Sequence, residues 1–179
     1  MTRTRFAAFN IMSLAMLSLA IAMPADSAIA QEKQRVSYKT PAEGTKYVQQ
    51  HAIDVGDVPG HQVRIYELQR TFPNNPPVIN ETKLKEVWSR NTSDYVDGNG
   101  PGTFYSVYML ENGDKFFARG TVVTQRTAEG KLSSMTSGTI TGGTGKFAGM
   151  RGIVRSLTTA DPKAGFNDGQ SEIEYWVEK

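Results

Sequence analysis

The stretch at residues 102–141 reads GTFYSVYMLENGDKFFARGTVVTQRTAEGKLSSMTSGTIT, and it decides the fold class. Three runs rich in β-branched and aromatic residues are separated by two short polar sequences, at 111–114 and 128–131. The first contains an Asn-Gly pair, which is typical of a type I′ hairpin turn, and the second contains a glycine suited to positive φ. Neither connection can hold a crossover helix, so the three strands are predicted to be antiparallel.

The same pattern extends on both sides of this meander. Strand-like runs recur at spacings of about 8–12 residues, as in all-β sandwiches and barrels. We expect strands at His61–Phe72, Lys83–Asn91, Gly102–Glu111, Lys115–Gln125, Leu132–Thr141, Gly149–Thr158 and Gln170–Glu178. A meander without covering helices must close, pack on a second sheet or expose long edges. The sequence therefore favours an all-β domain at 61–179, a single antiparallel, mostly up-and-down closed β-barrel of about eight strands, over a sandwich.

The first 60 residues differ from the rest. Residues 1–30 have a basic start, a short apolar run and a small-residue end at Ala28-Ile29-Ala30, the three parts of a secretory signal peptide. Cleavage before Gln31 would export the chain to the periplasm or the medium, with no stable membrane insertion afterwards. A retained N-terminal anchor is the alternative. Residues 31–60 form a polar N-terminal segment without clear periodicity, which we expect to be loosely held.

Composition narrows the class of protein further. Removing the signal peptide takes away Arg3, Arg5 and Asp26, which leaves a net charge of +1. Such a balanced charge gives no reason to expect a nucleic-acid partner. The chain contains no Cys, so we expect it to fold without disulfides although it is exported. The remaining residues are enough for one domain with a substantial core.

The most distinctive motif is GTITGGTGKFAGMRG at 138–152. Gly142, Gly143 and Gly145 permit a tight reversal with positive φ, and Phe147 can turn inward to fill one end of a barrel. This motif resembles the strand, glycine turn and returning strand of the allene oxide cyclase and dirigent barrels. The resemblance implies a small β-barrel fold. Barrels of this type often form trimers, so it also implies a homo-oligomer.

A second similarity lies in the sequence RIYELQ at 64–69. It is similar to the first barrel strand of plant allene oxide cyclases, where Tyr-Glu-Leu-Asn places a Glu and an Asn in the cavity. Glu67 matches that Glu, Gln69 stands at the Asn position, and Pro76 has the spacing of a pocket-lining Pro. The cavity Cys of the family has no counterpart here, which puts identity of activity in doubt.

Several side chains are candidates for a site inside the predicted barrel. If Glu67 points inward, burial would raise its pKa and suit it to proton transfer, with Arg119 as counter-charge. The alternative is a structural ion pair or an outward-facing charge. Several aromatic residues could line a pocket for a flat apolar ligand, or could belong to the core: Tyr66, Trp88, Tyr105, Tyr108 and Trp176.

Other motifs do not support cofactor or metal chemistry. The sequence at 143–148 fits G-x-G-x-x-A, but strands rather than a strand and a helix are expected around it. His51 and His61 are the two histidines, and no Cys is available to join them in a metal site. There is no G-x-S-x-G motif for a serine nucleophile. We therefore expect no cofactor and no metal.

Three classes of function stay open at this point. The leading hypothesis is an exported module that binds a small, largely apolar molecule in the lumen or mouth of the barrel. The alternatives are a cofactor-free isomerase or cyclase using Glu67, in which positioning matters most, and a structural or interaction protein. The volume and lining of the lumen distinguish all three.

Overall fold

The computed structural model describes residues 32–161 and 163–178 of the 179-residue chain. The expected signal peptide and its cleavage site lie outside the described residues. Both helices are single 3₁₀ turns, so no helix in the described part of the chain could span a membrane. The elements are β1 (Gln34–Thr40), η1 (Ala42–Gly44), β2 (Thr45–Asp54), β3 (His61–Thr71), β4 (Val78–Ile79), β5 (Thr82–Val96), β6 (Gly100–Leu110), β7 (Lys115–Arg126), β8 (Leu132–Gly143), η2 (Gly145–Phe147), β9 (Met150–Asp161) and β10 (Phe166–Val177).

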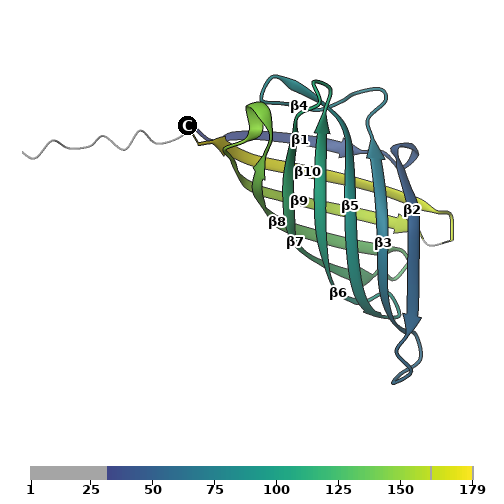
Figure 1. Cartoon of the computed structure of the whole chain (residues 1–179). Coiled ribbons are helices and arrows are strands. Elements are labelled where there is room, and N and C mark those ends of the chain that lie inside the picture. Colours follow the sequence, from purple (N-terminus) through teal and green to yellow (C-terminus); the bar gives the residue numbers. More distant parts are fainter. Residues whose placement is uncertain (1–31, 162, 179) are drawn as a thin grey trace, which may run out of the picture. The chain divides into compact units, whose positions relative to one another are not determined.

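The strands form one antiparallel sheet in the order β1-β10-β9-β8-β7-β6-β5-β3-β2, with the short β4 paired to β5. The sheet rolls up, so that β1, β10 and β9 cross behind β5, β3 and β2 (Figure 1). The prediction of an all-β antiparallel fold is confirmed. Closure is not confirmed, because β1 and β2 are the two ends of the sheet and are not hydrogen-bonded to each other.

The two ends of the sheet meet only at a corner. Pro41 and η1 turn the chain between β1 and β2, and the Gly44 amide donates to the Pro41 carbonyl (3.2 Å). Thr71, at the end of β3, donates its hydroxyl to the Gly44 carbonyl (3.4 Å). From this corner β1 and β2 diverge (Figure 1). We call the gap between them the seam.

The expectation of a loosely held lead-in at residues 31–60 is wrong. This segment supplies β1, which pairs with β10 over its whole length, and β2, which pairs with β3. Nine of the ten β2 residues are exposed, because an edge strand has only one neighbour. Its sequence therefore lacks the alternation of apolar and polar residues that marks a strand with one buried face.

Of the two tight hairpins of the meander, the one at 128–131 has positive φ at Gly130 (78°), as predicted, whereas the one at 111–114 differs from its predicted geometry. At 111–114 only Gly113 has positive φ (86°), and its amide donates to the Leu110 carbonyl (3.0 Å). A type I′ turn requires positive φ at both central residues, so this turn is of another type. Asp97 and Gly98, between β5 and β6, do have positive φ (49° and 79°). Their turn allows β5 to continue to Val96 instead of ending at Asn91.

The apolar core fills the end of the rolled sheet near η2. Phe147 is fully buried there, and its ring lies 5.9 Å from that of Phe116, which stacks at 4.2 Å on Tyr108. Gly145 has positive φ (51°), as expected, whereas Gly143 does not. Gly143 is needed for close approach instead, because a Cβ there would lie 2.5 Å from the Phe147 carbonyl oxygen.

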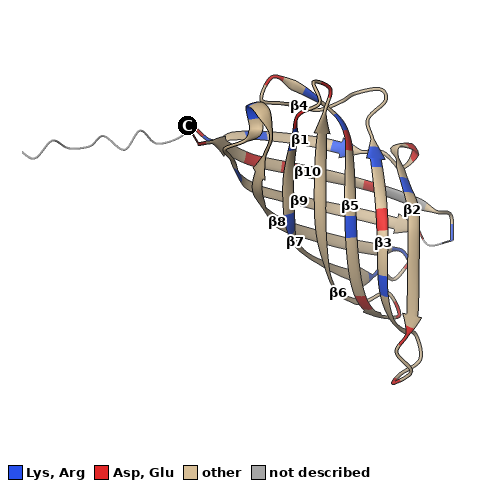
Figure 2. Ribbon diagram, in the orientation of Figure 1, with Lys and Arg blue, Asp and Glu red and all other residues tan. Residues whose placement is uncertain are grey.

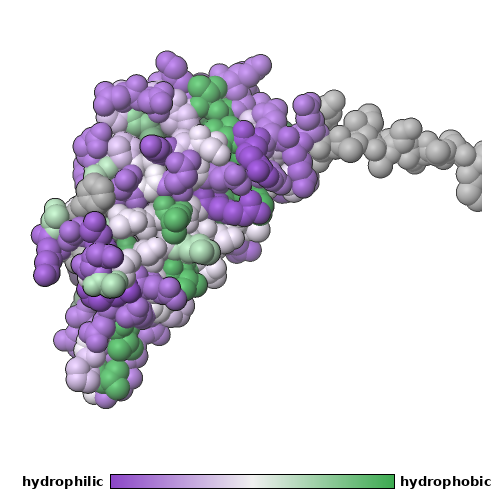
Figure 3. All heavy atoms as spheres, turned by 180° about the vertical axis from the view of Figure 1, so that it is seen from behind, coloured by the Kyte–Doolittle hydropathy of each residue, from purple (hydrophilic) through white to green (hydrophobic). Residues whose placement is uncertain are grey.

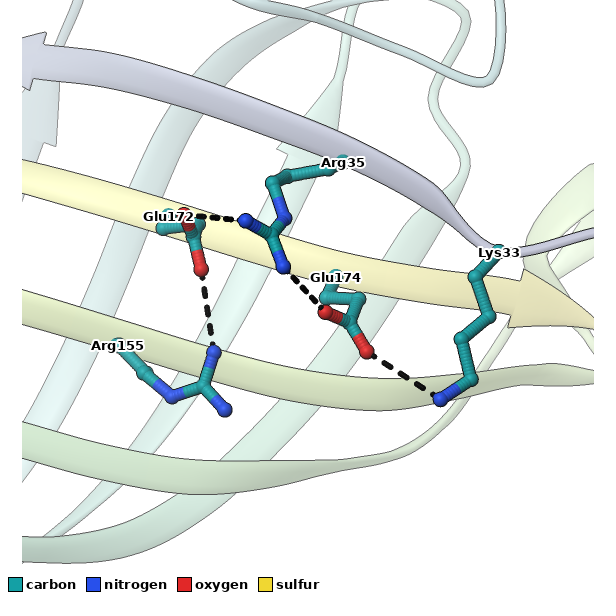
Figure 4. Close-up of polar contacts among 5 residues, drawn as sticks. All are labelled: Lys33, Arg35, Arg155, Glu172 and Glu174. Atoms are coloured by element: carbon teal, nitrogen blue, oxygen red, sulfur yellow. Dashed lines mark hydrogen bonds and ion pairs between the residues drawn. The ribbon is translucent and has the colours of Figure 1, made fainter.

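Acidic and basic residues are interspersed over the sheet (Figure 2). Five of them form an ion-pair cluster across the outer faces of β1, β10 and β9, drawn in Figure 4. Arg35 on β1 bridges Glu174 (2.9 Å) and Glu172 (3.7 Å) on β10. Glu172 also pairs with Arg155 on β9 (3.1 Å), and Glu174 with Lys33 (3.4 Å). The cluster adds side-chain contacts to β1, an edge strand whose backbone is paired with β10 alone.

Candidate functional site

A cavity of about 120 Å³ lies inside the rolled sheet. It is lined mainly by the inward-facing residues of β3, β5, β6 and the strands behind them, because successive side chains of a strand point to opposite faces. The cavity continues from the apolar core toward the hairpin turns at the other end of the sheet. Its lining is therefore mixed: apolar residues form one part of it, the apolar wall, and hydroxyl groups another, the hydroxyl wall.

Phe104 is the centre of the apolar wall. It is 4% exposed and lies in register with Gly120 and Gly138 on the two neighbouring strands. Its ring lies over both glycines, since a Cβ at Gly138 would be 2.5 Å from Phe104 Cζ. The small-residue strand faces noted in the sequence are therefore largely occupied by this ring. Val87 and Val122 extend the same wall.

Hydroxyl groups lie on both sides of Phe104 along β5 to β8, and they are hydrogen-bonded to one another. Ser89 Oγ lies 2.8 Å from Ser106 Oγ. Tyr95 bonds through its hydroxyl to Thr124 (2.7 Å), which bonds in turn to Ser134 (2.8 Å). A hydroxyl can donate one hydrogen bond and accept two, so these pairs retain capacity for a polar ligand.

Two arginines reach the cavity from the inner face of β3. Arg64 donates to Gln50 Oε1 (2.7 Å), and its guanidinium lies 5.1 Å from the ring centre of Tyr66. Arg70 makes one long hydrogen bond from Nη1 to Ser89 Oγ (3.4 Å). No ion pair to either arginine is found in the described part of the chain.

Buried tyrosines complete the cavity near Arg70. Burial raises the pKa of Tyr38 to about 12, and it raises the pKa of Tyr66 and of Tyr108 well above the ordinary value. The nearby charge of Arg70 opposes each of these shifts without reversing it. The three phenols therefore stay protonated at neutral pH, when they can donate hydrogen bonds but cannot act as bases.

Glu67 lies outside this cavity. Its carboxylate accepts a hydrogen bond in an ion pair with Arg90 (2.7 Å) and another from Gln49 (3.2 Å). Its neighbours on β3, Tyr66 and Leu68, line the cavity, so Glu67 is on the opposite face of the sheet. It is buried there (8% exposed). Of the alternatives that the sequence left open for Glu67, the structure shows an outward-facing side chain in an ion pair, and its partner is Arg90 rather than Arg119.

The other candidate residues are dispersed. Gln69 is on the outer face, where it donates to Glu86 (2.6 Å). Trp88 is its cross-strand neighbour there. Tyr105 is 59% exposed and is paired in register with Arg119.

Pro76 belongs to the loop between β3 and β4, where it lines a surface hollow. Of the predicted ligand-binding residues, Tyr66 and Tyr108 line the cavity. The inward-facing set that sequence reasoning missed is Arg64, Arg70, Ser89, Asn91, Ser106, Thr124, Ser134 and Thr136. Their signal was the alternation of small polar residues with larger ones along β5 and β8.

The two histidines are not brought together. His61 bonds through both ring nitrogens, to Asp57 (2.6 Å) and to Asp94 (2.7 Å), and these bonds raise its pKa, the one to Asp94 most. His51 lies on the exposed edge strand β2. Over the described residues, no group of three or more His, Asp or Glu side chains is arranged to hold a metal ion.

Comparison of the sequence with known proteins does not identify a family for this chain. No protein-family model matches the chain, and no curated protein is similar to it in sequence. The function is therefore argued from the cavity and its lining.

Proposed function

We propose that this protein binds a small molecule in the cavity of its rolled sheet. The sheet acts as a barrel whose wall is open along the seam between β1 and β2. The observation that carries the proposal is the coexistence, in one cavity, of the apolar wall around Phe104 and the hydroxyl wall around Ser89 and Thr124. Binding sites of this kind combine mostly apolar surface with a few convergent polar groups.

The size of the cavity limits the ligand. A volume of about 120 Å³ is close to that of an apolar protein cavity of about 150 Å³ that holds one benzene ring. The expected ligand is therefore a single ring or a chain of similar volume. The sequence suggested a largely apolar ligand. The hydroxyl wall argues for one that also carries polar groups, because these hydroxyls retain capacity for further hydrogen bonds.

The proposal can be tested by filling the cavity. Ser156 lines it, whereas the next residue, Leu157, points outward and is 53% exposed. Benzyl alcohol is a suitable probe, with an expected Kd of about 1 mM from the usual affinity per ligand atom. Ligand-observed NMR should show binding to the wild-type protein and to Leu157→Phe, and binding at least about tenfold weaker to Ser156→Phe. Equal binding to both variants would contradict the proposal.

An enzymatic role is the alternative, as a cofactor-free isomerase or cyclase of the allene oxide cyclase type. Such a reaction needs a group in the cavity that accepts a proton. Glu172 is the one acidic residue among the described residues that border the cavity, but its carboxylate points to the outer face, where Arg155 and Arg35 hold it. Glu67 lies on the other face. Binding is therefore the function we favour.

A purely structural or interaction role would be favoured by a continuous apolar surface. Hydrophobic side chains on the face shown in Figure 3 form separate groups among hydrophilic ones. Among the exposed apolar residues, Val123, Met135 and Leu157 form one row across β7, β8 and β9, and Ile53 and Val63 pair across β2 and β3. Small separate groups of this kind occur on many soluble proteins and do not by themselves define an interface.

We further propose that the chain is exported and that it self-associates, as the resemblance to dirigent and cyclase barrels suggests. Export predicts a mature N-terminus at Gln31, which mass spectrometry of the protein expressed from its full sequence can identify. Light scattering on the purified protein measures the assembly. A trimer is the expected result.

A further inference from the structure

We infer that the cavity selects an organic acid, a single-ring compound whose carboxylate binds Arg70. This inference rests on the proposed binding function and specifies the chemistry of the ligand. Three observations carry it: the uncompensated positive charge inside the sheet, the donors that surround Arg70, and the apolar surface beside it.

The first observation is charge. Arg64 and Arg70 both face the cavity, and no carboxylate of the described residues lies within ion-pair distance of either. Glu172 borders the cavity, but its carboxylate is on the outer face, in an ion pair with Arg155. A guanidinium that is partly removed from water is unfavourable without an opposite charge. A bound anion supplies that charge.

The second observation is the set of donors near Arg70. Its one hydrogen bond, to Ser89, uses Nη1 and is long (3.4 Å), so most of its N–H groups are available. Tyr38 and Tyr108 line the same cavity, and the ring of Tyr38 lies 5.5 Å from that of Phe72, the next inward residue after Arg70. Burial raises the pKa of both phenols, so both stay protonated and can donate. A carboxylate is a pure acceptor, and a guanidinium can bind it with two parallel hydrogen bonds.

The third observation is the apolar surface beside Arg70. Val87 is its cross-strand partner, and Leu68 is the preceding inward residue of β3. Both are buried, as is Phe72 just beyond the strand. A ring can pack on this surface while its carboxylate contacts Arg70.

Arg64 provides a matched control. It is on the same face of the same strand, but six residues away, which corresponds to about 20 Å along a strand. An acid that fits a cavity of about 120 Å³ cannot reach both arginines. Arg64 is also engaged by Gln50 and Tyr66. Replacing it removes the same charge from the cavity without removing the proposed contact.

The test compares benzoate with benzyl alcohol, which share the ring and differ in charge. We expect the wild-type protein to bind benzoate about 10- to 100-fold more tightly, the effect of hydrogen bonds to a charged group. Arg70→Gln should remove this preference and leave benzyl alcohol binding within about twofold. Arg64→Gln should keep most of it. Isothermal titration calorimetry at low salt measures all six affinities.

The possible results separate the two proposals. If both probes bind equally to the wild-type protein, or if Arg70→Gln keeps the preference for benzoate, the inference is wrong while the binding function stands. If neither probe binds, the proposed function itself fails. If Arg70→Gln does not fold, Arg70→Lys is used in its place. Lysine keeps the positive charge but cannot form the bidentate hydrogen bond to the carboxylate, so the preference for benzoate over benzyl alcohol should decrease. An unchanged preference in Arg70→Lys would overturn the role of the guanidinium.

Discussion

The contact between Phe104 and Gly138 forms the apolar wall of the cavity, and it can be measured by a double-mutant cycle. A Cβ at Gly138 would lie 2.5 Å from Phe104 Cζ and 2.5 Å from the Arg119 carbonyl oxygen. Both distances are far below van der Waals contact, so Gly138→Ala forces the ring and the neighbouring strand to move. Overpacking of this kind costs about 1–3 kcal/mol.

Phe104→Leu removes part of the ring that meets this methyl group. Alone it should cost up to about 1.5 kcal/mol, the usual limit for a hydrophobic replacement of similar volume. In the double variant the leucine leaves space for the new methyl group. We therefore expect the summed losses of unfolding free energy in the two single variants to exceed the loss in the double variant by about 0.5–1.5 kcal/mol, a typical coupling for residues in contact. The contact of the methyl group with the Arg119 carbonyl remains, so the relief is incomplete.

Urea unfolding of the four proteins, followed by tryptophan fluorescence, gives the required free energies. Thermal midpoints should fall by about 2–4 °C per kcal/mol in a domain of this size. Val123→Ala is the control partner for Phe104→Leu, because Val123 is exposed on the outer face of the adjacent strand and should show no coupling. Additive costs for Phe104 and Gly138 would refute the placement of the ring over the glycine.

Three further predictions concern the outer face. Glu67→Gln breaks the ion pair with Arg90, so it should lower the unfolding free energy by about 1–3 kcal/mol, as for hydrogen bonds to charged groups. Benzyl alcohol binding should be unchanged. A loss of binding at unchanged stability would instead place Glu67 in the binding site. The pKa of His61 is raised by its hydrogen bonds to Asp94 and Asp57. These bonds therefore stabilise the fold fully below pH 6.5, and their contribution disappears as the pH rises through the folded-state pKa of His61. His61→Gln should therefore flatten the melting temperature between pH 5 and 8.5, and an unchanged slope would contradict this. Arg35→Gln should lower the melting temperature at low salt and much less in 0.5 M NaCl, since exposed ion pairs are screened; a salt-independent loss would mean that packing matters instead.

The meander could be predicted because its turns and its strands agree. Glycines at the turns and runs of β-branched residues between them indicate antiparallel strands whatever the tertiary contacts. Strands β1 and β2 could not be recognised in the same way. Tyr47, Val48 and Ile53 on β2 are all about half exposed or more, so no face of this strand is marked by burial.

The sequence did not show which face of β3 points into the rolled sheet. For this reason the inward-facing Arg64 and Arg70 were not predicted as site residues. Ile65 and Glu67 point outward, whereas Arg64, Tyr66 and Arg70 point inward. Apolar and charged residues occur on both faces of this strand, so alternation alone does not show which face is inward. The cross-strand partners decide the question, since β5 places small polar residues opposite the inward face. That information is available only once the register of β3 with β5 is known.

The open seam explains how arginines can occupy the inside of this sheet. In a fully hydrogen-bonded barrel, an unpaired guanidinium among buried hydroxyls would have lost most of its hydration, at a cost of several kcal/mol. Here β3 lies second from the end of the sheet, and Arg64 and Arg70 are only half-buried. Both side chains keep contact with solvent, which reduces that cost. The proposed anion would replace this solvent at Arg70. A sheet closed by hydrogen bonds between β1 and β2 would bury the two guanidinium groups further, and it should therefore tolerate them less well.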